Sequence, residues 1–197
     1  MDLISALGLS SASGLNAYIP LVILGALDRW TDVINLPAGW DWLSSTPALI
    51  ILAVLLIIEV VADKIPALDS MNDVIQTLIR PASGGIVFSS GLGQEQVVDG
   101  SAGFPWGTFI VGVVIALVIH LLKSLSRPAA NVSTAGIAAP ALSTGEDVLA
   151  IGLSLFSIYL PILVLVLLVL LFGSAFYLIS KVRRAKLLPV GRSDTSS

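Results

Sequence analysis

The chain has 197 residues, of which 56% are apolar and only 12% are charged, with a net charge of −3. Soluble domains carry about a quarter of their residues as charges, so this composition excludes that class and predicts an integral membrane protein. The absence of cysteine excludes disulfides and thiolate metal sites, and a single histidine excludes a multi-histidine site.

Three apolar stretches are candidates for continuous membrane-spanning helices, which need about 20 residues at about 1.5 Å each. They cover residues 47–62, 104–122 and 148–180. The last stretch is longer than one crossing needs and contains Pro161. It is therefore either one kinked helix or two short passes.

Three other apolar stretches, at 5–27, 81–93 and 128–143, are interrupted by small residues and proline. Together with the continuous stretches they indicate three hairpins, each a broken element followed by a helix, and an internal repeat. We assign helix-break or packing roles to Gly14, Pro20, Gly91, Gly136 and Pro140. Such residues either let helices pack closely or interrupt them, so that freed backbone groups line a polar path.

The links between stretches predict a topology. Acidic, tryptophan-containing links at 28–42 and 93–106 suit an external interface, whereas five of the ten Lys and Arg residues lie at 181–192 and predict a cytoplasmic C-terminus. The chain start, with Asp2 and no basic residue, does not fit a cleaved signal peptide.

These signs predict an all-α, polytopic membrane helix bundle. About six transmembrane segments with both termini cytoplasmic satisfy them, and four crossings with two re-entrant segments are the alternative. We expect a single transmembrane domain over 1–182, followed by a basic and then polar tail over 183–197 that is disordered.

Polar residues gather after the first continuous stretch. Glu59 and Asp63 are four apart and share a helix face, with Lys64 beside them, and Pro66 should break or kink the helix. Further polar residues recur at spacings of three and four: Asp69, Asn72, Asp73, Gln76 and Arg80, and on the 104–122 helix and beyond, His120, Lys123 and Arg127. Each set predicts one polar stripe on a helix.

Two interpretations compete for these residues. They are solvated at the cytoplasmic interface, which we favour for Asp69 and Lys123, or they lie at membrane depth. A charge there costs about 3 kcal/mol on insertion scales and is usually paired and in use. Because long uncharged runs precede Glu59 and His120, we favour the second interpretation for them and for Asp63 and Arg80.

For two further groups of polar residues we prefer a structural role over a binding role. Asn16 and Tyr18 lie beside Pro20, where they could bind a solute or satisfy the carbonyls that proline frees. Glu146 and Asp147 are acids in the first turn of the last predicted helix, with Ser143 or Thr144 as its cap.

The runs LGLSSASGLNAYIPL, EVVADKIPALDSMNDVIQTLIRPASG and SRPAANVSTAGIAAP resemble a bacterial membrane-protein family known only as domain of unknown function 4126. The resemblance extends from about residue 7 to the last span. It implies a membrane protein of several helices and carries no activity or site residue. EVVADK is also similar to the Glu-x-Gly-Asp-Lys motif of a cation-exchanger family, but the acids here are four apart and Ala62 replaces the glycine. That similarity is an analogy only.

We predict a membrane transport protein, transporter or channel, that moves an inorganic cation or a proton-coupled small solute across the bacterial inner membrane. The ion- or substrate-binding residues would be Asn16, Glu59, Asp63, Asp69, Asn72 and Asp73, and the counter-charge or gating residues Lys64, Arg80, His120, Lys123 and Arg127. No cofactor is expected beyond a hard cation (Mg²⁺, Ca²⁺ or Mn²⁺), for which Glu59, Asp63 and Asp73 would be the oxygen ligands.

Two other classes remain open. A membrane enzyme acting on a lipid or lipid-linked phosphate would use His120 and Asp63 as acid and base, with Lys123 and Arg127 holding phosphate. A helper subunit would dock a larger partner through its small-residue faces. Enzyme and nucleic-acid motifs are absent from the sequence, so we expect no nucleic-acid partner and favour a non-enzymatic role. The bilayer and a second copy of the chain are the expected partners.

Overall fold

The computed structural model describes residues 1–92, 104–134 and 139–170, and residues 173, 177 and 180; the side chains of 66–70 and 126–139 are outside the description. Within these residues the regular elements are helices, as predicted. In chain order they are α1 (Leu3–Leu15), α2 (Tyr18–Trp30), the 3₁₀ turn η1 (Asp41–Ser44), α3 (Thr46–Ala62), α4 (Pro66–Leu92), α5 (Trp106–Thr134), α6 (Ala139–Tyr159) and a further helix over Pro161–Leu170.

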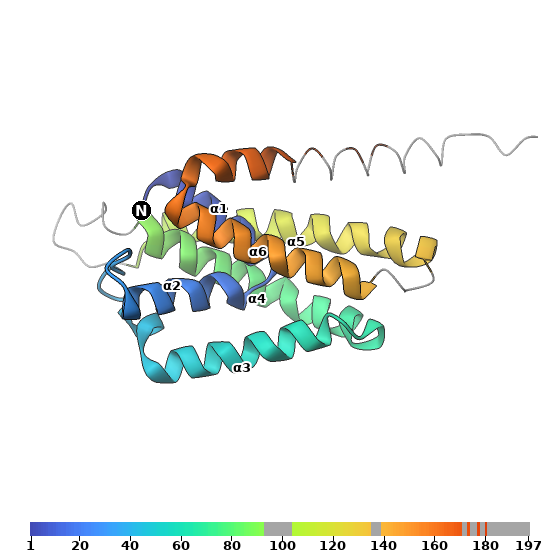
Figure 1. The fold of residues 1–197 in the computed structure, drawn as a ribbon, viewed down its shortest axis with the longest axis horizontal. Coiled ribbons are helices and arrows are strands. Elements are labelled where there is room, and N and C mark those ends of the chain that lie inside the picture. Colours follow the sequence, from blue (N-terminus) through green and yellow to red (C-terminus); the bar gives the residue numbers. More distant parts are fainter. Residues whose placement is uncertain (93–103, 135–138, 171–172, 174–176, 178–179, 181–197) are drawn as a thin grey trace, which may run out of the picture.

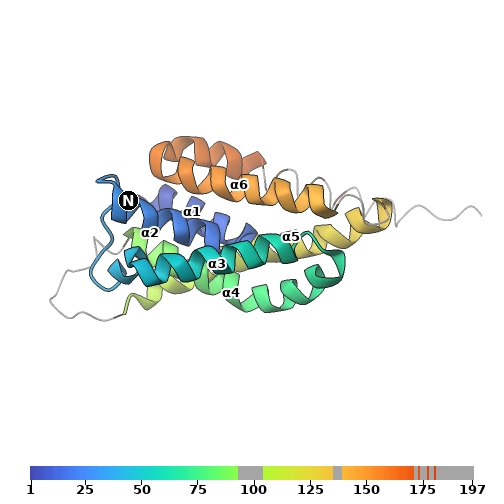
Figure 2. The ribbon, with the colours of Figure 1, turned by 60° about the horizontal axis from the view of Figure 1, so that its bottom comes forward.

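Helices α1 and α2 form a hairpin that starts and finishes at one end of the bundle (Figures 1 and 2). The Asp2 carboxylate caps α1 by accepting the Ser5 N–H at 2.8 Å, which holds the pKa of that carboxyl below its usual range. Each helix has 13 residues, so each is only about 20 Å long. Met1 lines a cavity of about 140 Å³ together with Ile34 and Ser90, which places the chain start beside the 31–40 loop.

The first apolar stretch therefore turns back inside the bundle and does not cross it. The turn is at Asn16, whose backbone is extended (φ −143°, ψ 124°). Pro20 lies in the first turn of α2, where a missing N–H costs little because that group has no partner within the helix. The prediction of six crossings is not confirmed. The N-terminus and the 28–42 link were predicted on opposite sides, which disagrees with the position of Met1 beside the 31–40 loop.

The other helices run back and forth along the long axis of the bundle (Figure 1). α3 leads away from the Met1 end, α4 returns to it, α5 leads away again and α6 returns. By length and composition, two of the described helices could each cross a membrane, over Trp106–Leu125 and Pro140–Tyr159. The Thr46–Ala62 and Pro161–Leu170 helices are apolar but shorter.

Proline acts as a boundary at some predicted breaks and not at others. Pro66 begins α4, and Pro161 begins a new helix that turns back beside α6, so 148–180 starts as two helices. In contrast, α4 continues through Pro81, because its small-residue face packs against α1 and α5 along its length and outweighs a proline cost of about 3 kcal/mol. Pro140 lies at the start of α6 and does not interrupt it. The described residues therefore do not show three hairpins that each begin with a broken element.

Glycines bring α1, α4 and α5 into close contact. A Cβ atom on Gly14 would lie 2.6 Å from the Ala116 carbonyl oxygen, and one on Gly84 would lie 2.7 Å from the Gly112 carbonyl oxygen. A Cβ on Gly91 would lie at an ordinary 3.5 Å from the nearest atom. Close packing thus needs glycine at Gly14 and Gly84, but not at Gly91. Gly136 and the predicted tail at 183–197 lie outside the described residues.

Candidate functional site

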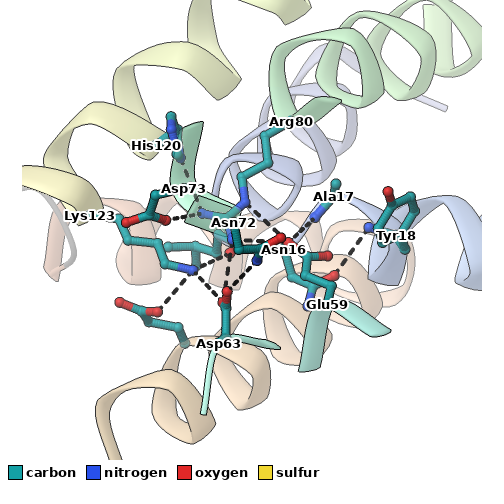
Figure 3. A network of polar contacts seen from close by, with 12 residues as sticks. Asn16, Ala17, Tyr18, Glu59, Asp63, Asn72, Asp73, Arg80, His120 and Lys123 are labelled. Carbon is teal, nitrogen blue, oxygen red and sulfur yellow. Dashed lines mark hydrogen bonds and ion pairs between the residues drawn. The ribbon is translucent and has the colours of Figure 1, made fainter. Parts of the chain in front are cut away.

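The α1–α2 turn is held in place by the side chain of Asn16 (Figure 3). Its Oδ1 accepts the N–H groups of Tyr18 at 3.1 Å and Ile19 at 3.2 Å, and its Nδ2 donates to Asp147 Oδ1 at 3.0 Å. Asn16 therefore caps the start of α2 and joins the hairpin to α6. It satisfies backbone N–H groups, whereas the sequence suggested either a bound solute or the carbonyls freed by Pro20.

The two helix ends at this turn each face a side chain of opposite charge. The Lys123 ammonium donates to the Leu15 carbonyl oxygen at 2.9 Å, at the C-terminal end of α1. The Ala17 N–H, at the start of α2, donates to Glu59 Oε1 at 3.4 Å. Helix N-termini carry partial positive charge and C-termini partial negative charge, so both contacts are favourable.

Arg80 occupies the centre of the site, and its side chain is 0% exposed. Its Nη2 lies 2.9 Å from Glu59 Oε1 and 3.4 Å from Asp63 Oδ2, and its Nε also donates to Glu59 Oε1, at 3.2 Å. The Asp73 carboxylate is 3.9 Å from Nη1. Charges buried to this degree are tolerated only when paired and hydrogen-bonded, which the guanidinium provides for two carboxylates together.

His120 connects Arg80 to the surface of α4. Arg80 Nη1 lies 3.1 Å from His120 Nδ1. Since a guanidinium can only donate, Nδ1 accepts and the ring proton is on Nε2. Nε2 lies 3.0 Å from Thr77 Oγ1, which donates onward to the Asp73 carbonyl oxygen. A line of polar contacts therefore runs from the buried arginine to the exposed residue Thr77.

Asp63 and Lys123 extend the site toward α6. Asp63 accepts from Asn72 Nδ2 at 2.6 Å and from Lys123 Nζ at 3.1 Å. Lys123 also pairs with Glu146 at 3.0 Å, and its side chain is 1% exposed. Lys123 is therefore not the solvated interface residue that the sequence favoured. Nearby, Lys64 pairs with Asp147 at 3.3 Å.

We call this group of residues the apex network: Asn16, Glu59, Asp63, Lys64, Asn72, Asp73, Thr77, Arg80, His120, Lys123, Glu146 and Asp147. Among these described residues, five are acids and three are permanent cations, so negative charge is in excess when all are ionised. The network joins helices α3 to α6 at the tip of the α1–α2 hairpin.

The chain also matches the model of a known protein family. The model of the family described as domain of unknown function (DUF4126) matches residues 3–181. The chain belongs to the DUF4126 family. The match confirms the resemblance that the sequence runs indicated, and it covers every helix of the structure described above. No curated protein and no solved structure matches the chain.

Exposure within the apex network of this DUF4126 chain rises in one direction. The side chains of Glu59 and Arg80 are 0% exposed, whereas those of Glu146, Asp73 and Lys64 are 16%, 21% and 35% exposed. The exposed members lie on the α3–α4 turn, the first half of α4 and the start of α6, at the end of the bundle away from Met1. The network is therefore least enclosed by protein at that end.

The arrangement of the three predicted metal ligands is set by Arg80. No group of three or more His, Asp or Glu side chains in the described part of the chain is arranged to hold a metal ion. Glu59, Asp63 and Asp73 do converge, but on the Arg80 guanidinium, which lies within 3.9 Å of all three.

Five buried side-chain oxygen atoms have no hydrogen-bond partner among the described residues: Glu59 Oε2, Asp73 Oδ1, Gln76 Oε1, Ser124 Oγ and Ser143 Oγ. Two of them, Glu59 Oε2 and Gln76 Oε1, belong to side chains near the same tyrosine. Both side chains neighbour Tyr18, since Gln76 and Glu59 each lie close enough to act on the tyrosine hydroxyl. An unsatisfied buried acceptor costs about 1–3 kcal/mol, so two of them close to one tyrosine call for a specific explanation.

The structure brings together most of the residues predicted for the site. Thr77 was not predicted from the sequence, and for Glu146 and Asp147 a role as acids in the first turn of a helix was preferred over a site role. The feature that could have identified Glu146 and Asp147 is the lysine that each one pairs with, because a buried cation requires an acid as its partner. Of the other predicted members, the side chains of Asp69 and Arg127 lie outside the described residues.

Proposed function

We propose that this DUF4126 chain is a multi-pass membrane protein that moves a proton or another cation across the bilayer through the apex network. Its outer surface supports the membrane assignment, because large apolar side chains are exposed along the helices. Examples are Ile57 on α3, Val74 and Leu78 on α4, Val114 and Leu125 on α5, and Val148 on α6. Soluble monomers rarely expose such continuous apolar faces.

Aromatic side chains indicate one edge of the hydrocarbon layer. Trp30, Trp42, Phe104 and Trp106 are all exposed at the Met1 end of the bundle, as in the aromatic belts of membrane proteins. The helix over Trp106–Leu125 has 20 residues and is therefore about 30 Å long, which matches the hydrocarbon thickness.

The depth of the network follows from the same helix. Lys123 lies about 26 Å along α5 from Trp106, and His120 about 21 Å, both within the hydrocarbon thickness. Exposed apolar residues, Leu125 on α5 and Met71 on α4, continue beyond this level. These lengths support our proposal that the network lies inside the membrane, nearer to the end opposite Met1.

The observation that carries the proposal is that the end of α1 and the start of α2 face buried charges at this depth. Lys123 contacts the first and Glu59 contacts the second. Membrane transporters use interrupted helices in this way to build ion sites near the middle of the bilayer. Here the excess of acids favours a positively charged cargo. A charge at such depth is costly and is usually kept for function.

The experiment is ion flux in sealed liposomes containing the purified protein. H⁺, Na⁺, K⁺, Mg²⁺, Ca²⁺ and Mn²⁺ are each tested under an imposed gradient. We expect flux of at least one ion, and a loss of at least tenfold in the Asp63→Asn variant, which keeps the side-chain size but removes the charge that Arg80 and Lys123 share.

The matched control is Asp41→Asn, at an exposed acid in η1 far from the network, which should leave the flux unchanged. Lack of flux for every ion, with monodisperse protein, would contradict the proposed function. An Asp63→Asn variant that is folded and fully active would also contradict it.

A further inference from the structure

We infer that the ion is a proton and that Glu59, together with Gln76, is the site that binds it. This inference rests on the proposed function and gives that function its ion. The observation behind it is the pair of buried oxygens, Glu59 Oε2 and Gln76 Oε1, for which the described residues provide no hydrogen-bond donor.

We assign one proton to the two atoms together. A proton on Glu59 Oε2 converts that acceptor into an O–H donor, and the amide oxygen of Gln76 is the acceptor in need of a donor beside the same tyrosine. The other carboxylate oxygen, Oε1, already accepts from Arg80 and from the Ala17 N–H. A proton can therefore be added at Oε2 without displacing any contact on Oε1.

A metal cation does not fit the same place. The Glu59 and Asp63 carboxylates lie within 3.4 Å of the Arg80 guanidinium, and Asp63 is also 3.1 Å from the Lys123 ammonium. A metal ion using these carboxylates would have to displace the fixed cations or be bound beside them, where like charges repel. A proton requires only a single lone pair.

Glu59 faces charged or titratable groups from each neighbouring element. They are Tyr18 on α2, Asp63 directly after α3, Arg80 on α4 and Lys123 on α5, and Arg80 in turn contacts Asp73 and His120. Arg80 keeps its charge throughout, because a guanidinium does not lose its proton in proteins. The three acids of this set, Glu59, Asp63 and Asp73, outnumber its two permanent cations, Arg80 and Lys123, which favours adding one positive charge at this point.

The step is a simple protonation. The Glu59 carboxylate takes one proton from water and forms one O–H bond, and release returns the proton to water at the other side. In the neutral state Arg80 loses one of its counter-charges and is held by Asp63, 3.4 Å away. The Ala17 N–H loses its negatively charged acceptor at the same time, so protonation weakens the favourable interaction at the start of α2.

Two measurements test this inference. The first is proton flux, followed with a pH-sensitive dye in proteoliposomes, for the parent protein, Glu59→Gln and the exposed control Asp41→Asn. The second is infrared difference spectroscopy on acidification, which detects the C=O band of a protonated carboxylic acid. We expect Glu59→Gln to reduce proton flux at least tenfold and to remove this band, and Asp41→Asn to change neither.

Gln76→Leu provides a second variant, which keeps Glu59 but removes its hydrogen-bond acceptor. We expect the carboxylic acid band to persist at a shifted frequency and the proton flux to fall. This variant keeps the test valid if Glu59→Gln does not fold.

The outcomes separate the two proposals. Flux of a metal cation that Glu59→Gln leaves unchanged, with no band assigned to Glu59, would overturn the proton site and retain the transport function. Lack of flux for every ion would overturn the transport function. In that case the band decides the site separately, since its loss in Glu59→Gln supports a protonated Glu59 and its absence from the parent protein overturns it.

Discussion

At the residue scale, Arg80 holds the apex network together, because it pairs with Glu59 and Asp63 and contacts His120. Among the described residues, Glu59 has ion-pair contact only with Arg80, whereas Asp63 is also paired with Lys123. The loss of Arg80 should therefore affect Glu59 more than Asp63.

We predict that Arg80→Met destabilises the protein by about 3–5 kcal/mol, the usual result of leaving a buried charge without its partner. Adding Glu59→Gln to this variant should recover a large part of the loss, because the orphaned charge is then removed. Thermal unfolding in detergent, followed by circular dichroism, gives the comparison.

Lys64→Met is the matched control, since the Lys64 side chain is 35% exposed and its ion pair with Asp147 should contribute less than about 1 kcal/mol. An equal loss in Lys64→Met and Arg80→Met would contradict the central role of Arg80. So would a double variant no more stable than Arg80→Met alone.

Helical spacing and uncharged flanking runs were enough to select Glu59, Asp63, Arg80 and His120 from the sequence. They could not reveal that Lys123 is buried, because spacing gives the face of a helix and not its depth in the bundle. They also could not pair Asn16 with Asp147, which are 131 residues apart. Such pairs depend on tertiary packing, which local patterns do not specify.

At the scale of elements, glycine allows the helices to approach closely enough for the network to form. The Gly84 and Gly112 backbones meet where α4 crosses α5, and Ser10 of α1 donates to both carbonyl oxygens, at 3.3 and 2.8 Å. This contact lies about one turn from Arg80, so the separation of α4 and α5 there also sets the position of the arginine.

We predict that Gly84→Ala and Gly112→Ala each destabilise the protein by about 1–3 kcal/mol, because the added methyl group would overlap backbone atoms that cannot move independently. Thermal unfolding of the purified variants measures the effect. Gly145→Ala is the control, since a Cβ there meets nothing within 4 Å and alanine favours the helix. Wild-type stability in both Gly84→Ala and Gly112→Ala would contradict this packing.

The sequence predicted the helical class, but it did not show which prolines begin a helix and which lie within one. Pro66 and Pro161 mark helix starts, whereas α4 passes through Pro81. The difference comes from packing, because a helix held on two sides by neighbours can absorb the lost hydrogen bond. Only the tertiary structure shows which helices are held in this way.

At the scale of the whole molecule, the α1–α2 hairpin determines from which side the apex network is reached. It fills the Met1 end of the bundle and leaves the partly exposed network residues at the other end. The basic residues at 181–192 predict a cytoplasmic C-terminus, and we propose that the open end of the network faces the same side.

Site-directed labelling tests this topology directly, because the chain has no cysteine and each introduced one is the only target. We predict that Leu3→Cys and Asp32→Cys react with a membrane-impermeant maleimide from outside the cell, and that Gly145→Cys reacts only after permeabilisation. Leu3 and Asp32 share a side because the hairpin returns to its starting end. Six crossings with both termini cytoplasmic would place them on opposite sides. Opposite labelling of Leu3 and Asp32 would thus contradict the hairpin, whereas labelling of Gly145→Cys from outside would keep the hairpin and reverse the side from which protons enter the network.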